Sequence, residues 1–384
     1  MKRVKAKPSG PSNALSKRAL NRALLARQML LERERVPVVA TVERLVGMRA
    51  QIPRPPFMGL WTRLEGFRRE DLLEPLHDKE LIRATAMRGT IHLMSTKDFL
   101  AFRPVLAEML VKGASGIAGK NMPKLDIETV YQLGRDFFAS PAPFDDFRKF
   151  LEKEHPQHGV PAIRAMAYTV RMGVPLAMVP TDVTWGFPGN AGFMLAEKWL
   201  GRKIPVTATA LEELVLRYLA AFGPATAADF QTWSALRGTQ NTFEKLRPRL
   251  VTFTDERRRE LFDLPKAPRP DEDTPAPVRF LPEYDNTLLA HADRTRIATD
   301  EHRTSVVSNN LQVIGTFLID GFVAGIWRID RARKSVELKL KPFVKIPKKA
   351  LPALEEEGES LLEFLEPDAS SRSVVATPKG FAFK

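Results

Sequence analysis

The chain has 384 residues, an ordinary apolar share of 44%, and 59 lysines and arginines against 46 acidic residues. The formal net charge of +13 favours a polyanionic partner, and the length suits about two to four domains. The absence of cysteine excludes disulfides, cysteine nucleophiles and thiolate metal sites, and no two histidines have the helical i, i+4 spacing. We therefore expect no metal and no cofactor. No apolar run reaches the roughly 18 residues of a membrane span, so we expect a cytoplasmic protein without one.

The N-terminal third is expected to hold a basic tail and a winged-helix unit. Residues 1–13 carry four basic side chains among prolines and a glycine, which fits a disordered end or an arm that touches phosphates. Apolar spacing predicts helices over residues 15–33 and from Thr41 to before Pro53. "DKELIRATAMRGTIHLMSTKDFLAF" then predicts a helix, a strand at 89–94 and a helix capped by Ser95. This order is that of a winged helix, which we assign to residues 14–125.

The same order of elements recurs twice further along the chain. In residues 126–204, "FDDFRKFLEKEHP" and "PAIRAMAYTVRMG" predict helices, and "VPLAMVP" and "DVTWGF" predict the strands of a wing. In residues 205–270, three helices are predicted by "ALEELVLRYLAAFG", "TAADFQTWSAL" and "QNTFEKLRPRL". The last is the helix that a helix-turn-helix inserts into a groove. "VTFTDERRRELFDL" then predicts a strand, a basic turn and a strand.

The proline-rich acidic segment 265–277 predicts a linker, after which the pattern changes to strands. "LQVIGTFLIDGFVAGIWRID" holds two alternating runs joined at Asp320-Gly321, which indicates a hairpin, and "KSVELKLKPF" adds a strand. "KKALPALEEEGESLLEFL" predicts a helix. Residues 271–384 therefore predict a small β-barrel domain, and the expected fold class is α+β, with three tandem winged-helix units before the barrel.

Helix-turn-helix units in a basic chain indicate double-stranded DNA as the partner. Several units in one polypeptide can follow a duplex without dimerising, so we expect a monomer. Candidate phosphate contacts lie on the third helix and the wing tip of the third unit: Lys245, Arg247, Arg249, Arg257, Arg258 and Arg259. Each of them also fits a charged face that is merely solvated.

Five segments of the sequence resemble one family of proteins. They are "LNRALLARQMLLER", "VERLVGMRAQIPRPPFMGLWTRLEGF", "MRGTIHLMSTKDF", "AFGPATAADFQTWSAL" and "LPEYDNTLLAHADRTRI". In this order they are similar to the bacterial winged-helix DNA-binding proteins that include the AlkZ-type DNA glycosylases, from about residue 15 to about residue 365. The resemblance implies three tandem winged helices and a C-terminal β-barrel in a C-shaped DNA cradle. For characterised members, it implies excision of alkylated purines, including the unhooking of interstrand crosslinks.

The family's catalytic motif, Gln-x-Gln or Gln-x-Asp in a sister branch, falls on Arg49-Ala50-Gln51. Gln51 matches its second position, whereas Arg49 replaces the first glutamine. An N7- or N3-alkylated purine is already cationic and leaves readily, so the enzyme mainly holds a water at the sugar C1′ and stabilises an oxocarbenium-like state. Arginine has five donors and no acceptor, so Arg49 cannot act as a base, whereas the Gln51 carbonyl can orient water.

Three interpretations of Arg49 remain open at this stage. It is a structural arginine paired with an acid, its stem covering apolar surface. It is a DNA-phosphate contact in a non-catalytic or altered protein. Or it joins Gln51 in a modified catalytic pair.

Other polar residues also have two interpretations each. Arg27 falls inside the apolar arc of the first helix, where it forms a buried ion pair with an acid such as Glu43 or binds DNA. His92, on the strand at 89–94, is a structural histidine or lines the DNA cleft. For Asp285 and His291, one interpretation is a loop that enters the DNA cradle and brings them near the target base. The other is a strand-turn-strand in which they have a structural role.

The sequence thus predicts a DNA-binding repair protein that resembles monofunctional glycosylases acting on alkylated or crosslinked duplex DNA. Arg49 leaves its catalytic competence open. The alternatives are a non-catalytic winged-helix DNA-binding protein, acting as a regulator or lesion protector, and a structural nucleoid protein. A regulator usually reads a palindrome as a dimer, and the sequence shows no heptads for dimerisation. No phosphate-binding loop or nucleophile elbow supports another enzyme class.

Overall fold

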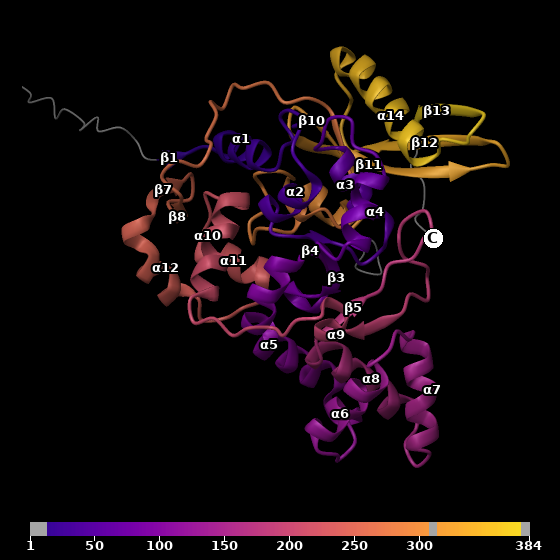
Figure 1. Cartoon of the computed structure of the whole chain (residues 1–384). Helices are drawn as coiled ribbons and strands as arrows, with labels where there is room; N and C mark the ends of the chain where they lie inside the picture. Colours follow the sequence, from indigo (N-terminus) through magenta and orange to yellow (C-terminus); the bar gives the residue numbers. More distant parts are fainter. Residues whose placement is uncertain (1–13, 307–312, 378–384) are drawn as a thin grey trace, which may run out of the picture.

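The computed structural model describes residues 14–306 and 313–377, which form a mixed α+β fold of fourteen α-helices and three sheets (Figure 1). The α+β class predicted from the sequence is therefore confirmed. The predicted basic tail, residues 1–13, lies outside the described residues. Within the described ranges, no helix combines the length and the apolar composition that crossing a membrane requires.

A five-stranded antiparallel sheet in the order β2-β4-β3-β5-β6 forms the first of the three sheets. Its strands are β2 (Met48–Arg49), β3 (Leu81–Thr85), β4 (Ile91–Ser95), β5 (Leu176–Met178) and β6 (Phe193–Leu195). Strand β3 pairs with β4 on one side and with β5 on the other, where Arg83 lies opposite Met178. Strands from the first two predicted units therefore belong to one sheet.

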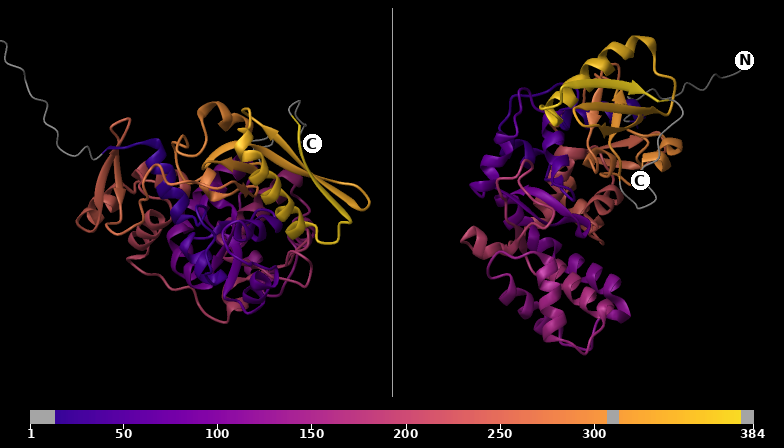
Figure 2. Two further views of the ribbon diagram at one scale, coloured as in Figure 1. Left: turned by 90° about the horizontal axis from the view of Figure 1, so that it is seen from above. Right: turned by 90° about the vertical axis from the view of Figure 1, so that its right-hand side faces the viewer.

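Nine helices accompany this sheet. They are α1 (Lys17–Arg27), α2 (Val38–Arg44), α3 (Arg54–Trp61), α4 (Glu70–His77), α5 (Thr96–Ala118), α6 (Ile127–Phe137), α7 (Phe144–Glu154), α8 (Val160–Gly173) and α9 (Ala196–Leu200). The predicted cap of α5 is confirmed, because the Ser95 hydroxyl accepts the Asp98 N–H at 3.1 Å. Helices α6 to α8 form one end of the molecule, opposite α14 and the C-terminal sheet, in Figure 1 and in the right-hand view of Figure 2.

Several predicted elements in this part are wrong. Helix α1 ends at Arg27 because Met29 takes a left-handed conformation and the following N–H bonds back into the helix. Helix α2 begins after Pro37 rather than at Thr41. Residues 81–85, predicted as a helix, form β3, whose residues are all buried, so its apolar run shows no alternation. The second strand of residues 126–204 is β6, not the predicted "DVTWGF".

The third predicted unit has the expected elements. They are α10 (Ala210–Phe222), α11 (Ala227–Ser234), α12 (Gln240–Leu246), β7 (Val251–Asp255) and β8 (Glu260–Asp263). Thr226 and Asp229 form a reciprocal capping box at the start of α11. The hairpin β7–β8 is extended by β1 (Ala14–Leu15), which pairs with β7 in parallel. The segment that opens the described chain thus joins the sheet of the third unit.

The C-terminal sheet has the order β13-β12-β11-β10-β9. Its strands are β9 (Arg279–Leu281), β10 (Thr316–Ile319), β11 (Phe322–Arg331), β12 (Ser335–Pro342) and β13 (Ser371–Ala376), and the accompanying helices are α13 (Asp300–Arg303) and α14 (Leu351–Leu365). The hairpin at Asp320-Gly321 is confirmed, and both residues have positive φ. The predicted barrel is wrong: among the described residues β9 and β13 are unpaired edges, and α14 packs on the sheet.

Two apolar clusters connect the parts of the fold. The first runs from α2–α4 through α6–α8 to the C-terminal sheet, and the second from α1 and α5 through α10–α12 to β10. A half-buried ion pair between Asp98 of α5 and Arg217 of α10, at 2.7 Å, adds a polar link. Elements from all four predicted units therefore share one connected scaffold.

Candidate functional site

The segment that carries Arg49 and Gln51 follows the end of a helix. Val46 and Gly47 both have positive φ, and the Gly47 N–H donates to the Val42 carbonyl at 2.9 Å, which terminates α2. The chain then enters β2, where Arg49 lies opposite His92 of β4. The expectation that Arg49 continues the apolar face of a helix is therefore wrong.

Arg49 is half-buried and lies over an aromatic ring. Its guanidinium carbon is 4.5 Å from the centroid of the Tyr284 ring. Its buried Nε has no hydrogen-bond partner, and burial lowers the pKa of Arg49. No carboxylate within residues 14–306 and 313–377 forms an ion pair with it. In this structure Arg49 therefore does not have the acidic partner that the structural interpretation requires.

The small cavity beside Arg49 is lined by two acidic residues, and each has its own arginine. Asp285 contacts Arg63 at 2.9 Å with both side chains buried, and Glu283 contacts Arg54 at 2.6 Å. The paired arginines neutralise both acids, so Arg49 is the excess positive charge of this cavity. Among the described residues, no group of three or more acidic or histidine side chains converges as a metal site would require.

The main chain around Gln51 is fixed from two sides. The Ala50 N–H donates to the Ile91 carbonyl at 2.8 Å, and the Gln51 Oε1 accepts the Ile91 N–H at 3.3 Å. From the other side, Arg83 Nε donates to the Ala50 carbonyl at 2.9 Å and Arg83 Nη2 to the Gln51 carbonyl at 3.4 Å. Gln51 itself is exposed, so its amide meets solvent, and its Oε1 retains a second lone pair for a water.

His92 of β4 lies opposite Arg49 and has the positive charges of Arg88 and Arg49 near it. The ring is fully buried, and its Nδ1 is 3.0 Å from the Thr90 carbonyl. Burial, followed by the charges of Arg88 and Arg49, lowers the pKa of His92 to about 3. His92 is therefore neutral near pH 7. Arg88, whose φ is 57°, lies in the turn between β3 and β4. It donates a hydrogen bond to the Trp233 carbonyl and thereby joins the β3–β4 hairpin to α11.

Two further candidate DNA-binding residues lie in the interior of the fold, as His92 and Asp285 do. Arg27 is 1% exposed and pairs with Asp263 at 2.7 Å, so the expected partner Glu43 is wrong. Asp263 follows α1 by more than two hundred residues, so the sequence does not reveal this contact. His291 is also 1% exposed, its Nε2 lies 2.9 Å from the Phe222 carbonyl, and burial lowers its pKa to about 3. Neither side chain is at the surface in this structure.

The basic residues of the third unit lie at the surface or partly exposed. Four of them contact carboxylates: Lys245 with Glu212, Arg247 with Glu244 and Glu260, and Arg257 and Arg259 with Asp293. Arg249 and Arg258 are exposed, and within the described ranges neither forms an ion pair. Exposed ion pairs contribute little stability, so these arginines can exchange a carboxylate for a phosphate at small cost.

Three residues that build this site are not among the candidates predicted from the sequence: Arg83, Arg88 and Tyr284. Arg83 was placed on a predicted helix, where its contact with the main chain of Gln51 could not be anticipated. Arg88 precedes Gly89 in a tight turn; the glycine is a local signal of a turn in the sequence, whereas the positive φ of Arg88 is known only from the structure. Tyr284 lies far along the sequence from Arg49, and no local pattern connects the two.

Comparison with known proteins assigns the chain to a family. The family model described as "DNA glycosylase AlkZ-like" matches residues 42–364, and the chain belongs to this family. It is 25% identical over 361 residues to an "Interstrand DNA cross-link repair glycosylase" of Streptomyces sahachiroi, covering 87% of this chain and 92% of that protein. Its fold is similar to that of the solved Streptomyces sahachiroi DNA glycosylase AlkZ, with a TM-score of 0.75 and 19% identity over 95% of this chain and 100% of that one. The family resemblance seen in the sequence is confirmed.

Proposed function

We propose that this protein is a monofunctional DNA glycosylase that hydrolyses the N-glycosidic bond of alkylated or crosslinked purines in duplex DNA. The observation that carries this proposal is the exposed Gln51 at the family's motif: its side-chain Oε1 accepts the Ile91 N–H of β4, and its main-chain carbonyl accepts a hydrogen bond from Arg83. The family match and the net charge of +13 support a DNA substrate. The cross-link repair named for the relative suggests that bulky lesions belong to the substrates.

To hydrolyse the N-glycosidic bond of a cationic base, the protein mainly has to position a water molecule. A water oxygen attacks C1′, the bond from C1′ to the purine nitrogen breaks, and the electron pair of that bond neutralises the cationic base. The proton lost by the water passes to solvent, because an amide is a very poor base. Gln51 accepts an O–H of the water through the free lone pair of its Oε1 and so holds the oxygen toward C1′.

Arg49 then serves as a phosphate clamp beside the lesion. A cation next to a developing oxocarbenium ion is unfavourable, and a phosphate bound to Arg49 offsets this charge. The ring of Tyr284 covers one face of the guanidinium. The N–H donors lie in the plane of the guanidinium, so the ring does not block them from a phosphate. Arg49 has no carboxylate partner within the described ranges, so binding a phosphate breaks no existing ion pair.

A second candidate function is non-catalytic binding of damaged DNA. It is favoured by two facts about the motif: the Gln51 Oε1 already accepts the Ile91 N–H, and Arg49 provides no second acceptor for water. A protein with this motif would hold a lesion without releasing the base.

The experiment is a single-turnover base-release assay on duplex DNA carrying 7-methylguanine. We expect release by the wild type, a loss of about 10²- to 10³-fold in Gln51→Ala, and weaker DNA binding at a retained rate in Arg49→Gln. Arg35→Gln is the matched control, because Arg35 is exposed and paired with Glu65. No release by any variant, with equal binding of damaged and intact duplex, would sink the glycosylase proposal. An inactive wild type together with an active Arg49→Gln would establish the second candidate.

The finer architecture also belongs to this proposal. We propose that residues 14–125, 126–204 and 205–270 act as three winged-helix units in a C-shaped cradle, with residues 271–384 closing it. Support comes from α10–α12 and the hairpin β7–β8, which have the order of a winged helix. Arg249 and Arg258 are the best-placed phosphate contacts of the third unit. We further propose a cytoplasmic monomer, and sedimentation of the protein with and without duplex DNA tests its oligomeric state.

A further inference from the structure

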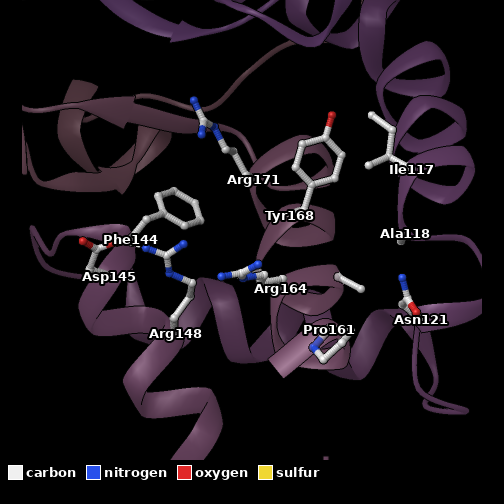
Figure 3. Close-up of a pocket in the computed structure, with 12 residues that line it drawn as sticks. Ile117, Ala118, Asn121, Phe144, Asp145, Arg148, Pro161, Arg164, Tyr168 and Arg171 are labelled. Atoms are coloured by element: carbon white, nitrogen blue, oxygen red, sulfur yellow. Dashed lines mark hydrogen bonds and ion pairs between the residues drawn. The ribbon is translucent and has the colours of Figure 1, made fainter. Parts of the chain in front are cut away.

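A pocket of about 560 Å³ lies between α5, α7 and α8, outside the site described above (Figure 3). We name it the α8 pocket and define it by six of the side chains that line it: Asn121, Phe144, Arg148, Arg164, Tyr168 and Arg171. Neither the proposed reaction nor the predicted DNA contacts use any of these residues. The pocket therefore requires its own explanation.

One face of α8 supplies most of the polar chemistry. Arg164, Tyr168 and Arg171 are spaced at i, i+4 and i+7, so they lie along one side of the helix. In Figure 3 these three side chains and Arg148 of α7 surround the same space. The acidic residue that lines the pocket, Asp145, is bound to Arg148.

Two cations of this face have no acidic partner. Among residues 14–306 and 313–377, no carboxylate forms an ion pair with Arg164 or Arg171. Arg164 is exposed, whereas Arg171 is half-buried, and burial lowers its pKa. A half-buried cation without a counter-ion is unfavourable, and an anion that enters the pocket would offset this cost.

The pocket also has aromatic walls. The Arg171 guanidinium lies 5.9 Å from the centroid of the Phe144 ring, and the Tyr168 ring lines the space next to it on α8. Tyrosine and phenylalanine rings and guanidinium planes are the surfaces on which nucleic-acid bases stack. Cations for a phosphate and flat faces for a base together match the two halves of a nucleotide.

The pocket and the Gln51 site are linked electrostatically through Arg83. Arg83 donates to the carbonyls of Ala50 and Gln51. Burial, followed by the positive charge of Arg171, lowers the pKa of Arg83 to about 9. Arg83 Nη1 is buried and has no hydrogen-bond partner. Arg83 and Arg171 thus form a line of positive charge that runs from the main chain of Gln51 toward α8.

We propose that the α8 pocket binds a nucleotide of the DNA strand that passes Gln51, with its phosphate on Arg164 and Arg171 and its base against Tyr168. The proposal rests on the proposed function only in taking DNA as the ligand. A nucleotide could also come from solution, and the two sources share the same chemistry, so the test includes both.

The first measurement is the salt dependence of binding to a labelled DNA duplex between about 50 and about 200 mM salt. Loss of one phosphate contact lowers the slope of log affinity against log salt by about 0.9, or about 0.7 on single-stranded DNA. We expect this loss in Arg164→Gln, and no change in Arg135→Gln, whose exposed side chain on α6 is paired with Glu128 outside the pocket. An unchanged slope in Arg164→Gln overturns the phosphate assignment.

The second measurement separates the base contact from the phosphate contact. Tyr168→Leu removes the stacking surface but no charge, so we expect roughly 5- to 160-fold weaker binding with the wild-type slope. Thermal unfolding of each variant checks that the fold is retained, and Arg171→Lys keeps the charge if Arg171→Gln unfolds. Binding as tight as that of the wild type in Tyr168→Leu overturns the base assignment.

A calorimetric titration with deoxyadenosine monophosphate tests whether the nucleotide comes from solution or from a DNA strand. Binding of the free nucleotide that Arg164→Gln abolishes, with an unchanged DNA slope, overturns the assignment to a strand. Base release is measured in parallel to separate the two proposals. A wild type that binds DNA without releasing a base, with a reduced slope in Arg164→Gln, refutes the glycosylase and supports the pocket. Base release by the wild type, with an unchanged slope in Arg164→Gln, refutes the pocket alone.

Discussion

Replacing Arg27 by methionine is expected to destabilise the fold and to leave DNA binding unchanged. The side chain makes five hydrogen bonds, two to the Asp263 carboxylate and three to the carbonyls of Leu219 and Pro268. Removing one partner of a buried ion pair typically costs about 3–5 kcal/mol. Arg269 also contacts Asp263 at 2.5 Å and still neutralises it in the variant, so we expect the lower end, about 3 kcal/mol.

Scanning calorimetry measures this loss. With an unfolding entropy of about 2 cal/mol/K per residue, 3 kcal/mol corresponds to a decrease in Tm of roughly 4 °C if the chain unfolds cooperatively. Arg269→Gln is the matched control: this half-exposed arginine contacts the same carboxylate, and we expect a loss of about 1 kcal/mol or less. An unchanged Tm for Arg27→Met, together with a salt slope reduced by about 0.9, would show that Arg27 leaves Asp263 to bind a phosphate.

Three further variants test the interior of the site and the support of α8. Because burial holds the pKa of His92 near 3 against about 6.5 in the unfolded chain, stability is complete above pH 6.5 and falls as the pH decreases. Between pH 7.5 and 5 this loss is about 2 kcal/mol, and denaturant titrations of His92→Gln should lack it; an equal pH dependence contradicts the buried neutral ring. Tyr284→Leu should lower the DNA salt slope as Arg49→Gln does, whereas Tyr284→Phe should not; a normal slope in Tyr284→Leu argues against the ring as the support of Arg49. In Gly134→Ala the new Cβ would lie 2.3 Å from Val170 Cγ1 of α8, so we expect a loss of about 1–3 kcal/mol in thermal unfolding; a second change, Val170→Ala, should restore part of it.

The elements that the sequence predicts well are those with local signals at their ends. Helix α11 has its capping box at Thr226, α10 ends before Gly223, and the hairpin at Asp320-Gly321 has the turn that its residues favour. Each signal lies within a few residues of the feature that it specifies. These two helices of the third unit and the C-terminal hairpin could therefore be predicted without knowledge of the packing.

The elements that the sequence predicts poorly depend on packing. The strand β3 has no alternation because both of its faces are buried, and the segment at Arg49 becomes a strand because β4 lies beside it. The strand patterns alone predict a barrel. In the described chain, however, α14 packs on the C-terminal sheet, and the edge strands of this sheet, β9 and β13, do not pair with each other. Whether a sheet closes depends on twist and on covering helices, and neither can be read from alternation.

The contacts between distant segments also determine what Arg49 can do. From the sequence, an arginine at the motif is consistent with an ion pair, a phosphate clamp or a catalytic role, although its lack of an acceptor argues against the last. The structure supplies the ring of Tyr284 and arginine partners for the nearby acids, so no carboxylate in the described ranges neutralises Arg49. The free protein therefore bears the cost of a half-buried cation, and a bound phosphate would relieve it. Relief of this unfavourable charge on binding would add to the affinity of the protein for DNA. Gln51, which carries an acceptor, remains the residue that can orient water.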